Sequence, residues 1–247
     1  MPVTLQFIGT GDAFGSGGRF NTCLLLRADG QAYLVDCGAT SLVALRRAGI
    51  APASIDAILL SHLHGDHFGG VPFFLLDSRF SEPRARPWII AGPRGVARRV
   101  LDTLDLLFPG ARVKVSDSVA LEFIEWTDGV GARIGSLVVT PVPVVHPSGA
   151  PSYGLRIETG AKTLAYSGDT QWTESLVDLA RDTDLFVCEC YTRERDVPYH
   201  LSYRVLQQKR PALATRRLVL IHLGPDMLAH AGELDAEIAS EGAVIEI

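Results

Sequence analysis

The chain has 247 residues, of which 47% are hydrophobic, and a formal net charge of −5 at pH 7. This length can bury a large core in one domain or in two closely packed halves, and no linker or repeat marks a boundary, so we expect a single domain over residues 1–247. No run of about 18 apolar residues and no signal-peptide pattern is present, which predicts a soluble cytoplasmic protein without a membrane partner. The acidic charge gives no general attraction to phosphate backbones and disfavours long nucleic acids as partners.

The first fifty residues predict the edge of a sheet and a covering helix. The expected elements are strands at residues 3–8, 21–27 and 32–36, a hairpin at Asp29-Gly30, and a helix at residues 40–49. The glycine-rich residues 9–18 do not fit a nucleotide fingerprint, because Phe14 stands where glycine is required and a strand follows where a helix should. They predict instead a backbone that passes close to a cleft.

The next stretch holds three histidines and an aspartate within six positions. Residues 58–60 predict a buried strand, and the loop after it carries His62, His64, Asp66 and His67. His62 and His64 can face one direction on an extended segment, and Asp66 with His67 can turn towards the same point. Imidazoles and a carboxylate suit an ion such as zinc, and hydrolases often hold two such ions about 3.5–4 Å apart. The pattern therefore indicates a metal site rather than a polar surface loop.

The rest of the chain predicts alternating helices and strands. A helix at residues 68–80 is apolar almost all round, which suits a buried or subunit-facing position. A helix at residues 93–108 carries three arginines that we expect on a solvated face. The expected strands are residues 88–91, and then 113–115, 121–126, 132–134 and 137–145 as the start of a second sheet. The last elements are strands at residues 153–158 and 162–166 around a turn at 159–161, a helix at 173–181, a strand at 185–189, a helix from 203 to about 214 and a strand at 243–247.

Three later strands end in further side chains of the metal-ligand type. His146 ends an apolar run, Asp169 follows residues 163–168, and His222 ends residues 218–222. Strand ends are the edge at which α/β sheets usually carry ligands. A lone histidine at a strand end is more often structural. Four residues cannot complete two ions, however, and these three together supply the missing ligands.

The whole pattern resembles the metallo-β-lactamase superfamily over nearly the full chain. The residues that carry the resemblance are His62-x-His64-x-Asp66-His67, His146, Asp169 and His222. The resemblance implies an α+β fold, the four-layer αββα sandwich. It also implies one divalent ion held by His62, His64 and His146, a second held by Asp66, His67 and His222, and Asp169 bridging the two. Asp36, at a strand end, resembles the aspartate that orients a ligand without binding metal, with a plain turn carboxylate as the alternative.

This site favours a dinuclear hydrolase in which a metal-bridged hydroxide is the nucleophile. Zinc fits the ligands best, with manganese or iron as alternatives. Asp169 in place of cysteine, and His64 in place of glutamate, resemble dinuclear hydrolases rather than zinc β-lactamases or diiron flavoproteins. Asp66 has a second, catalytic role in this interpretation, because it is placed to hold or relay the proton of the water.

Two further segments resemble the ribonuclease Z-like branch of the superfamily. They are Phe7-Ile-Gly-Thr-Gly with Arg19-Phe-Asn-Thr22, and His200-Leu-Ser. The resemblance implies that His200 assists the phosphate or the leaving group, with a surface or helix-capping histidine as the alternative. We therefore expect a phosphodiesterase that acts on a small, cyclic or nucleotide phosphodiester. Cleavage of transfer RNA precursors is disfavoured, because the substrate arm of that branch has no counterpart here. Relatives are often dimers, which makes a homodimer an open alternative.

Two other functions stay open from the sequence. A thioester or lactone hydrolase similar to glyoxalase II would use the same metal site and would not need His200. A metal-bearing carrier or redox sensor without hydrolytic turnover would hold iron and show a redox response. The remaining histidine, His230, is expected at the surface.

Overall fold

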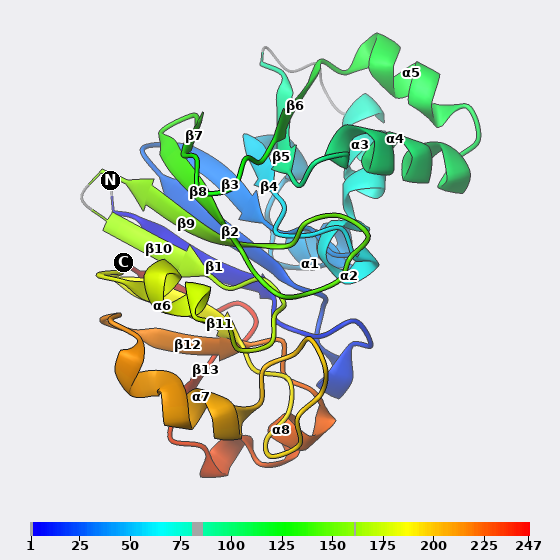
Figure 1. Ribbon diagram of the computed structural model, residues 1–247. Helices are drawn as coiled ribbons and strands as arrows, with labels where there is room; N and C mark the ends of the chain where they lie inside the picture. Colours follow the sequence, from blue (N-terminus) through cyan, green and yellow to red (C-terminus); the bar gives the residue numbers. More distant parts are fainter. Residues whose placement is uncertain (1, 81–85, 161) are drawn as a thin grey trace.

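The computed structural model describes residues 2–80, 86–160 and 162–247, and its strands form two sheets (Figure 1). The first sheet contains, in spatial order, β14 (Val244–Glu246), β1 (Thr4–Gly9), β2 (Cys23–Ala28), β3 (Gln31–Val35), β4 (Ala57–Leu59), β5 (Trp88–Gly92) and β6 (Leu121–Glu125). The second contains β13 (Glu237–Ile238), β12 (Leu218–Ile221), β11 (Leu185–Glu189), β10 (Lys162–Tyr166), β9 (Tyr153–Thr159), β8 (Leu137–Pro143) and β7 (Ala132–Ile134).

The two sheets pack face to face, and helices cover their outer faces. The helices on the first sheet are α1 (Ser41–Arg47), α2 (Gly65–Phe68), α3 (Val71–Phe80), α4 (Val96–Leu107) and α5 (Ala111–Ser118). Those on the second sheet are α6 (Ser175–Ala180), α7 (Tyr203–Lys209) and α8 (Pro225–Ala229). Successive strand residues alternate between cores: Leu24 and Leu26 of β2 face the core between the sheets, whereas Leu25 faces the helices. The predicted αββα sandwich is confirmed.

Some predicted elements were wrong. Residues 113–115, expected as a strand, lie inside α5, because Val-Lys-Val is too short a run to distinguish a strand from one buried helix face. Residues 121–125 pair with β5 as the edge of the first sheet and do not begin the second. The turn expected at residues 159–161 falls partly on Ala161, outside the described residues.

The helix expected at residues 68–80 is divided between α2 and α3. A side chain at Gly70 would meet the carbonyl oxygen of Gly38 at 2.3 Å, so the chain must pass the end of β3 with no side chain there. Because α2 begins at Gly65, Asp66 and His67 are helical rather than part of a loop. The helix expected from residue 203 to about 214 ends at Lys209, where a short 3-10 helix containing Pro211 follows.

Among the described residues, every helix is too short or too polar to cross a bilayer.

Candidate metal centre

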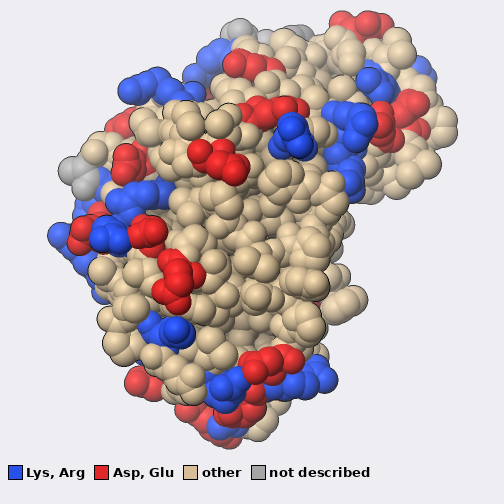
Figure 2. Space-filling model, in the orientation of Figure 1, with Lys and Arg blue, Asp and Glu red and all other residues tan. Residues whose placement is uncertain are grey.

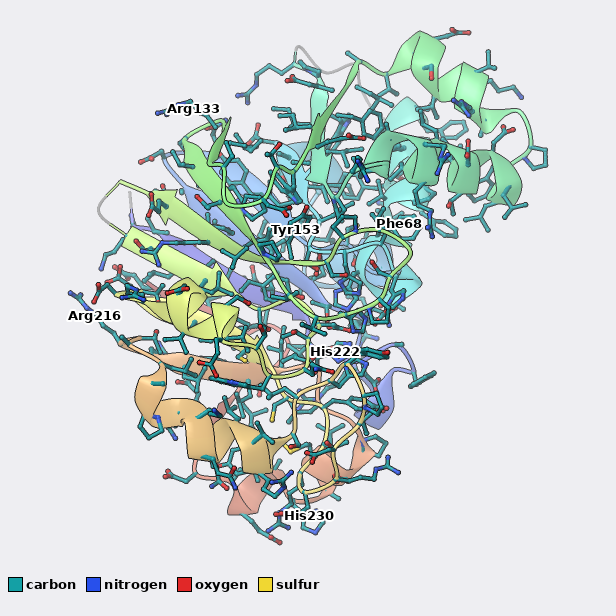
Figure 3. The ribbon with its side chains drawn as sticks, in the orientation of Figure 1. Phe68, Arg133, Tyr153, Arg216, His222 and His230 are labelled. Carbon is teal, nitrogen blue, oxygen red and sulfur yellow. The ribbon has the colours of Figure 1, made fainter. Side chains whose placement is uncertain are left out.

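The predicted ligands lie at one edge of the sandwich, where strands from both sheets end. The segment after β4 supplies His62 and His64, and the short helix α2 supplies Asp66 and His67. The segments after β8, β10 and β12 supply His146, Asp169 and His222. In Figure 3, His222 lies near the middle of the molecule, whereas His230 lies at the bottom of the view, after α8.

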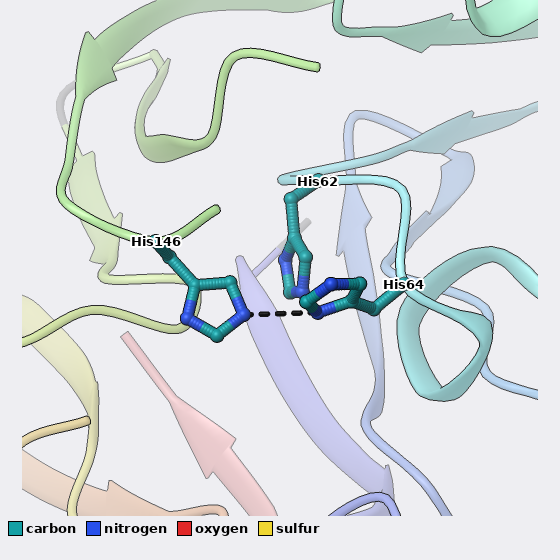
Figure 4. Close-up of side chains that lie close together, drawn as sticks. All are labelled: His62, His64 and His146. Atoms are coloured by element: carbon teal, nitrogen blue, oxygen red, sulfur yellow. Dashed lines mark hydrogen bonds between the residues drawn. The ribbon is translucent and has the colours of Figure 1, made fainter. Parts of the chain in front are cut away.

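Three of the histidines form one cluster. The side chains of His62, His64 and His146 point towards one another (Figure 4), and their candidate ligand atoms lie within 4.8 Å of each other. His64 Nδ1 lies 2.9 Å from His146 Nε2. These are the residues expected to share the first ion, although the role itself stays a prediction.

Asp66, His67, Asp169 and His222 form a second cluster. His67 Nε2 lies 3.2 Å from both Asp66 Oδ2 and Asp169 Oδ1. His222 Nε2 lies 3.3 Å from Asp66 Oδ2 and 3.4 Å from Asp169 Oδ2. The same Oδ2 atom of Asp169 lies 3.9 Å from the Nε2 atoms of His62 and His146. Asp169 therefore stands between the two clusters, where a bridging ligand has to be.

These distances fit divalent metal ions. Ligands about 2.0–2.1 Å from a tetrahedral ion lie about 3.3 Å from each other, which matches the contacts of the second cluster. Within the described part of the chain, the buried Nε2 atoms of His62 and His67 and the Oδ1 atom of Asp169 have no hydrogen-bond partner. Unpaired buried polar atoms are costly, and two ions, one at each cluster, would satisfy all three.

Three carboxylates, those of Asp36, Asp66 and Asp169, surround His67 at the floor of the site. Burial opposes a charge on His67, but Asp169, Asp66 and Asp36 outweigh it and raise the pKa of His67 well above its usual value. Burial also opposes the charge on Asp169, yet His222 and His67 hold the pKa of Asp169 well below its usual value. Several negative groups in so small a volume need positive charge nearby, which a metal ion supplies.

Asp36 holds His67 from the side opposite the cluster. His67 Nδ1 donates a hydrogen bond to Asp36 Oδ2 at 2.7 Å, which leaves Nε2 facing Asp66 and Asp169. The same carboxylate accepts hydrogen bonds from the Tyr166 hydroxyl at 2.8 Å and from the Ser61 backbone and hydroxyl at 2.8 and 2.7 Å. This is the geometry expected of a residue that orients a ligand. Sequence reasoning did not single out Tyr166 or Ser61.

His200 lies beside both clusters and is paired with a buried carboxylate. Its ring centroid is 5.0 Å from that of His146 and 5.7 Å from that of His222. His200 Nδ1 lies 3.3 Å from Glu189 Oε2. Burial opposes a charge on His200, but the hydrogen bond to Glu189 and its charge outweigh burial and raise the pKa of His200 above its usual value. Glu189 was not assigned a role from sequence, although its position at the end of β11 carried the same signal as the other strand ends.

The backbone of Tyr199 supports the first cluster. His146 Nδ1 donates to the carbonyl oxygen of Tyr199 at 3.0 Å, which leaves Nε2 directed at His64. Tyr199 has a left-handed φ of 68°, and Asp36 and His222 have left-handed φ angles of 58° and 56°. Strained non-glycine residues of this kind gather at functional sites, because the surrounding structure must hold them in place.

Two glycines let the ligand segments approach each other. A side chain on Gly38 would lie 2.1 Å from the carbonyl oxygen of Asp66, so only glycine lets α2 pack against the end of β3. Gly168, next to Asp169, has a φ of +60°, and a side chain there would lie 2.6 Å from the Tyr153 carbonyl oxygen.

The clusters open into a cleft of about 260 Å³. Its walls include His64, Asp66, His146, Asp169, His222 and His200, together with Asp12, Ala13, Phe14, Tyr191 and Val197. The glycine-rich turn thus contributes residues 12–14 to the cleft. On the face shown in Figure 2, lysine and arginine lie mainly around the edge, and the middle of the face is largely uncharged.

The two sheets, their covering helices and the paired clusters define a protein with the metallo-β-lactamase fold. The chain is 21% identical to the metallo-β-lactamase fold protein YhfI of Bacillus subtilis, with a TM-score of 0.80 and all of both chains covered. It is 28% identical to a ribonuclease Z of Mycolicibacterium paratuberculosis, over 92% of this chain and 88% of that one. It is 33% identical to the uncharacterized protein ML1173 of Mycobacterium leprae, over 91% of this chain and 79% of that one.

Residues 3–243 match the family described as anti-Pycsar protein Apyc1, and the chain belongs to this family. The predicted superfamily, its ribonuclease Z-like branch and the hydrolase class are confirmed.

Proposed function

We propose that this protein is a dinuclear metal-dependent phosphodiesterase that acts on a small, cyclic or nucleotide phosphodiester. The observation that carries the proposal is the position of Asp169 between two ligand clusters, with the His200–Glu189 pair at the same cleft. A relative named ribonuclease Z, an enzyme name for phosphodiester cleavage, supports this reaction type.

In this proposal His62, His64 and His146 would hold one ion and Asp66, His67 and His222 a second, with Asp169 placed to be a ligand of either. Zinc suits this set of imidazoles and carboxylates, and manganese or iron can replace it. When bound, the two ions supply a water that ionises near neutral pH and positive charge for the phosphoryl oxygens.

The side chains of the protein then position and transfer protons. Asp36 fixes the ring of His67, and the Tyr199 carbonyl fixes the ring of His146, so that each Nε2 keeps its place. The Asp66 carboxylate accepts the proton of the attacking water. His200 donates a proton to the leaving oxygen, while Glu189 holds its Nδ1 on the other side.

The cleft favours a small substrate over a long nucleic acid. Its volume of about 260 Å³ is near the lower limit for sites that enclose a small ligand. The chain carries a net charge of −5, and the face in Figure 2 shows no continuous basic track across its middle. The proposal extends to a single domain over residues 1–247 and to a homodimer in solution.

The experiment is metal analysis of the purified protein, followed by a substrate panel. The panel contains bis-aryl phosphate, 2′,3′- and 3′,5′-cyclic nucleotides, a thioester and a lactone. Turnover of the phosphodiesters, abolished by a chelator and restored by zinc or manganese, is the expected result. Turnover confined to the thioester or lactone would contradict the phosphodiesterase assignment, and bound iron with a redox response and no turnover would favour a sensor.

A further inference from the structure

Phe14 stands at the mouth of the cleft and has no part in the metal centre. Its residue surface is 82% exposed, although it lines the same cleft as His64, Asp66 and His222. Because its ring is exposed to this degree, Phe14 adds little of the folding free energy that a buried phenylalanine contributes. The ring is therefore apolar surface left open beside a strongly polar floor.

Hydrogen bonds in the loop around Phe14 fix the backbone that carries its ring. The carboxylate of Asp12, itself fully buried, accepts hydrogen bonds from the Phe14 N–H at 3.2 Å and from the Ser16 N–H at 2.9 Å. The Ser16 hydroxyl donates to the same carboxylate at 2.6 Å. Asn21 Nδ2 donates to the Asp12 carbonyl oxygen at 2.9 Å, which ties the loop to the residues before β2. The backbone is thus fixed by Asp12, and the ring of Phe14 is left free for an incoming group.

An exposed aromatic ring beside a candidate phosphodiesterase centre is suited to bind the base of a nucleotide. Nucleobases stack on aromatic side chains, and each such contact contributes about 1–3 kcal/mol to binding. Val197 and Tyr191 add further apolar and aromatic surface to the same cleft. An alkyl or bare sugar phosphodiester has no flat ring to place against such a surface.

We propose that Phe14 is the platform on which the base of a nucleotide phosphodiester stacks, while its phosphodiester lies over the floor formed by Asp66 and His222. This rests on the proposed phosphodiesterase function and assigns the contact with the base to one residue, Phe14, outside the metal centre. Because a phenyl ring has no hydrogen-bond donor or acceptor, it accepts all four bases.

The test compares four 3′,5′-cyclic nucleotides with the abasic ribose 3′,5′-cyclic phosphate. Phe14→Ala should raise KM at least tenfold for each cyclic nucleotide, with kcat within about twofold, and should leave the abasic compound unaffected. Phe14→Trp should keep the low KM, because it restores a flat ring. Leu106→Ala, which removes a side chain that is 81% exposed on α4, is the matched control and should change nothing.

Binding gives a second readout that does not depend on turnover. Calorimetry with a hydrolysis-resistant cyclic nucleotide phosphorothioate should show affinity at least tenfold weaker for Phe14→Ala than for the wild type. Equal affinities and equal KM values would overturn the proposal, as would an equal loss on the abasic compound. A change in sedimentation of Phe14→Ala without a change in KM would assign Phe14 to a protein contact instead. Failure of the proposed function differs from all of these, because the wild type would then hydrolyse none of the five phosphodiesters.

Discussion

The floor of the cleft and its rim are built in opposite ways. On the floor, His62, His67 and Asp169 are buried, and their polar atoms face one another or side chains such as Asp36. On the rim, Phe14 and Tyr199 lie on loops, with 82% and 45% of their surfaces exposed. This contrast separates two tasks: the floor can hold metal only as a packed unit, whereas the exposed side chains of the rim can change without disturbing it. Substitutions on the floor should alter metal content, and loss of a rim side chain should alter catalysis or substrate binding. Tyr199 is the exception, because its backbone carbonyl contacts His146, so a substitution that shifts this backbone should reach the metal site.

The strongest test of this separation is Asp169→Ala. Asp169 lies between the two clusters, so its loss should remove at least one ion and leave His67 and His222 without a shared carboxylate. Phosphodiester turnover should fall by more than the roughly 10–100-fold typical of residues that only orient a ligand. Metal analysis by mass spectrometry checks the stoichiometry. A variant that keeps both ions would show that Asp169 does not bridge them.

A backbone change on the floor should have the next largest effect. In Gly38→Ala, the new methyl group would lie 2.1 Å from the Asp66 carbonyl oxygen, so α2 must move away from β3. We expect a loss of unfolding free energy of about 1–3 kcal/mol, together with weaker metal binding. Gly65→Ala is the control, because the same methyl group there meets open space in α2. Thermal unfolding of both variants makes the comparison, and equal melting temperatures would count against a tightly packed floor.

Substitution of His200, which lies beside both clusters, should reduce catalysis without loss of metal. His200→Ala should lower kcat for phosphodiesters at least tenfold by removing the proton donor, while both ions stay bound. Glu189→Gln should give a smaller loss in the same direction, because it weakens the contact that holds the His200 ring. His230→Ala is the histidine control and should match the wild type. Unchanged turnover in His200→Ala would remove its proposed role and favour the thioester or lactone alternative.

The smallest effect is expected for substitution of Tyr199, which should change metal affinity at the first cluster only several-fold. Its left-handed backbone presents a carbonyl oxygen to His146, and a β-branched residue adopts this conformation poorly. Tyr199→Val should therefore weaken metal binding at the first cluster several-fold, whereas Tyr199→Gly should keep it. Competition with a chromophoric chelator measures both affinities. The same affinity in Val and Gly variants would mean that the carbonyl contact does not position His146.

The sequence predicted the floor better than the rim. The seven candidate ligands could be located because each follows an apolar strand, and strand ends of a layered sheet meet at one edge. The role of Tyr199 could not be found in this way, because its contribution is a backbone carbonyl set by a φ angle. In the sequence, Phe14 served only to exclude a nucleotide-binding fingerprint in the glycine-rich turn. Its exposure at the cleft could not be predicted, because exposure depends on how Asp12 folds the loop.

The layers of the fold were predicted from the resemblance to the metallo-β-lactamase superfamily, and the errors have a local cause. The side chains of β2 alternate between the two cores, as this layering requires. Residues 113–115 are only Val-Lys-Val, and packing of α5 against α3 and α4 decided their conformation. Tertiary contacts of that kind are not visible in a short pattern.

The central claim is that two divalent ions sit on this floor and drive phosphodiester hydrolysis. The most direct measurement is to strip the protein with a chelator and titrate it with zinc, while following bound metal and cyclic nucleotide turnover in the same samples. We expect turnover to rise only as the second ion binds and to reach its maximum at two ions per chain. Full turnover at one ion per chain, or in the stripped protein, would contradict the central claim.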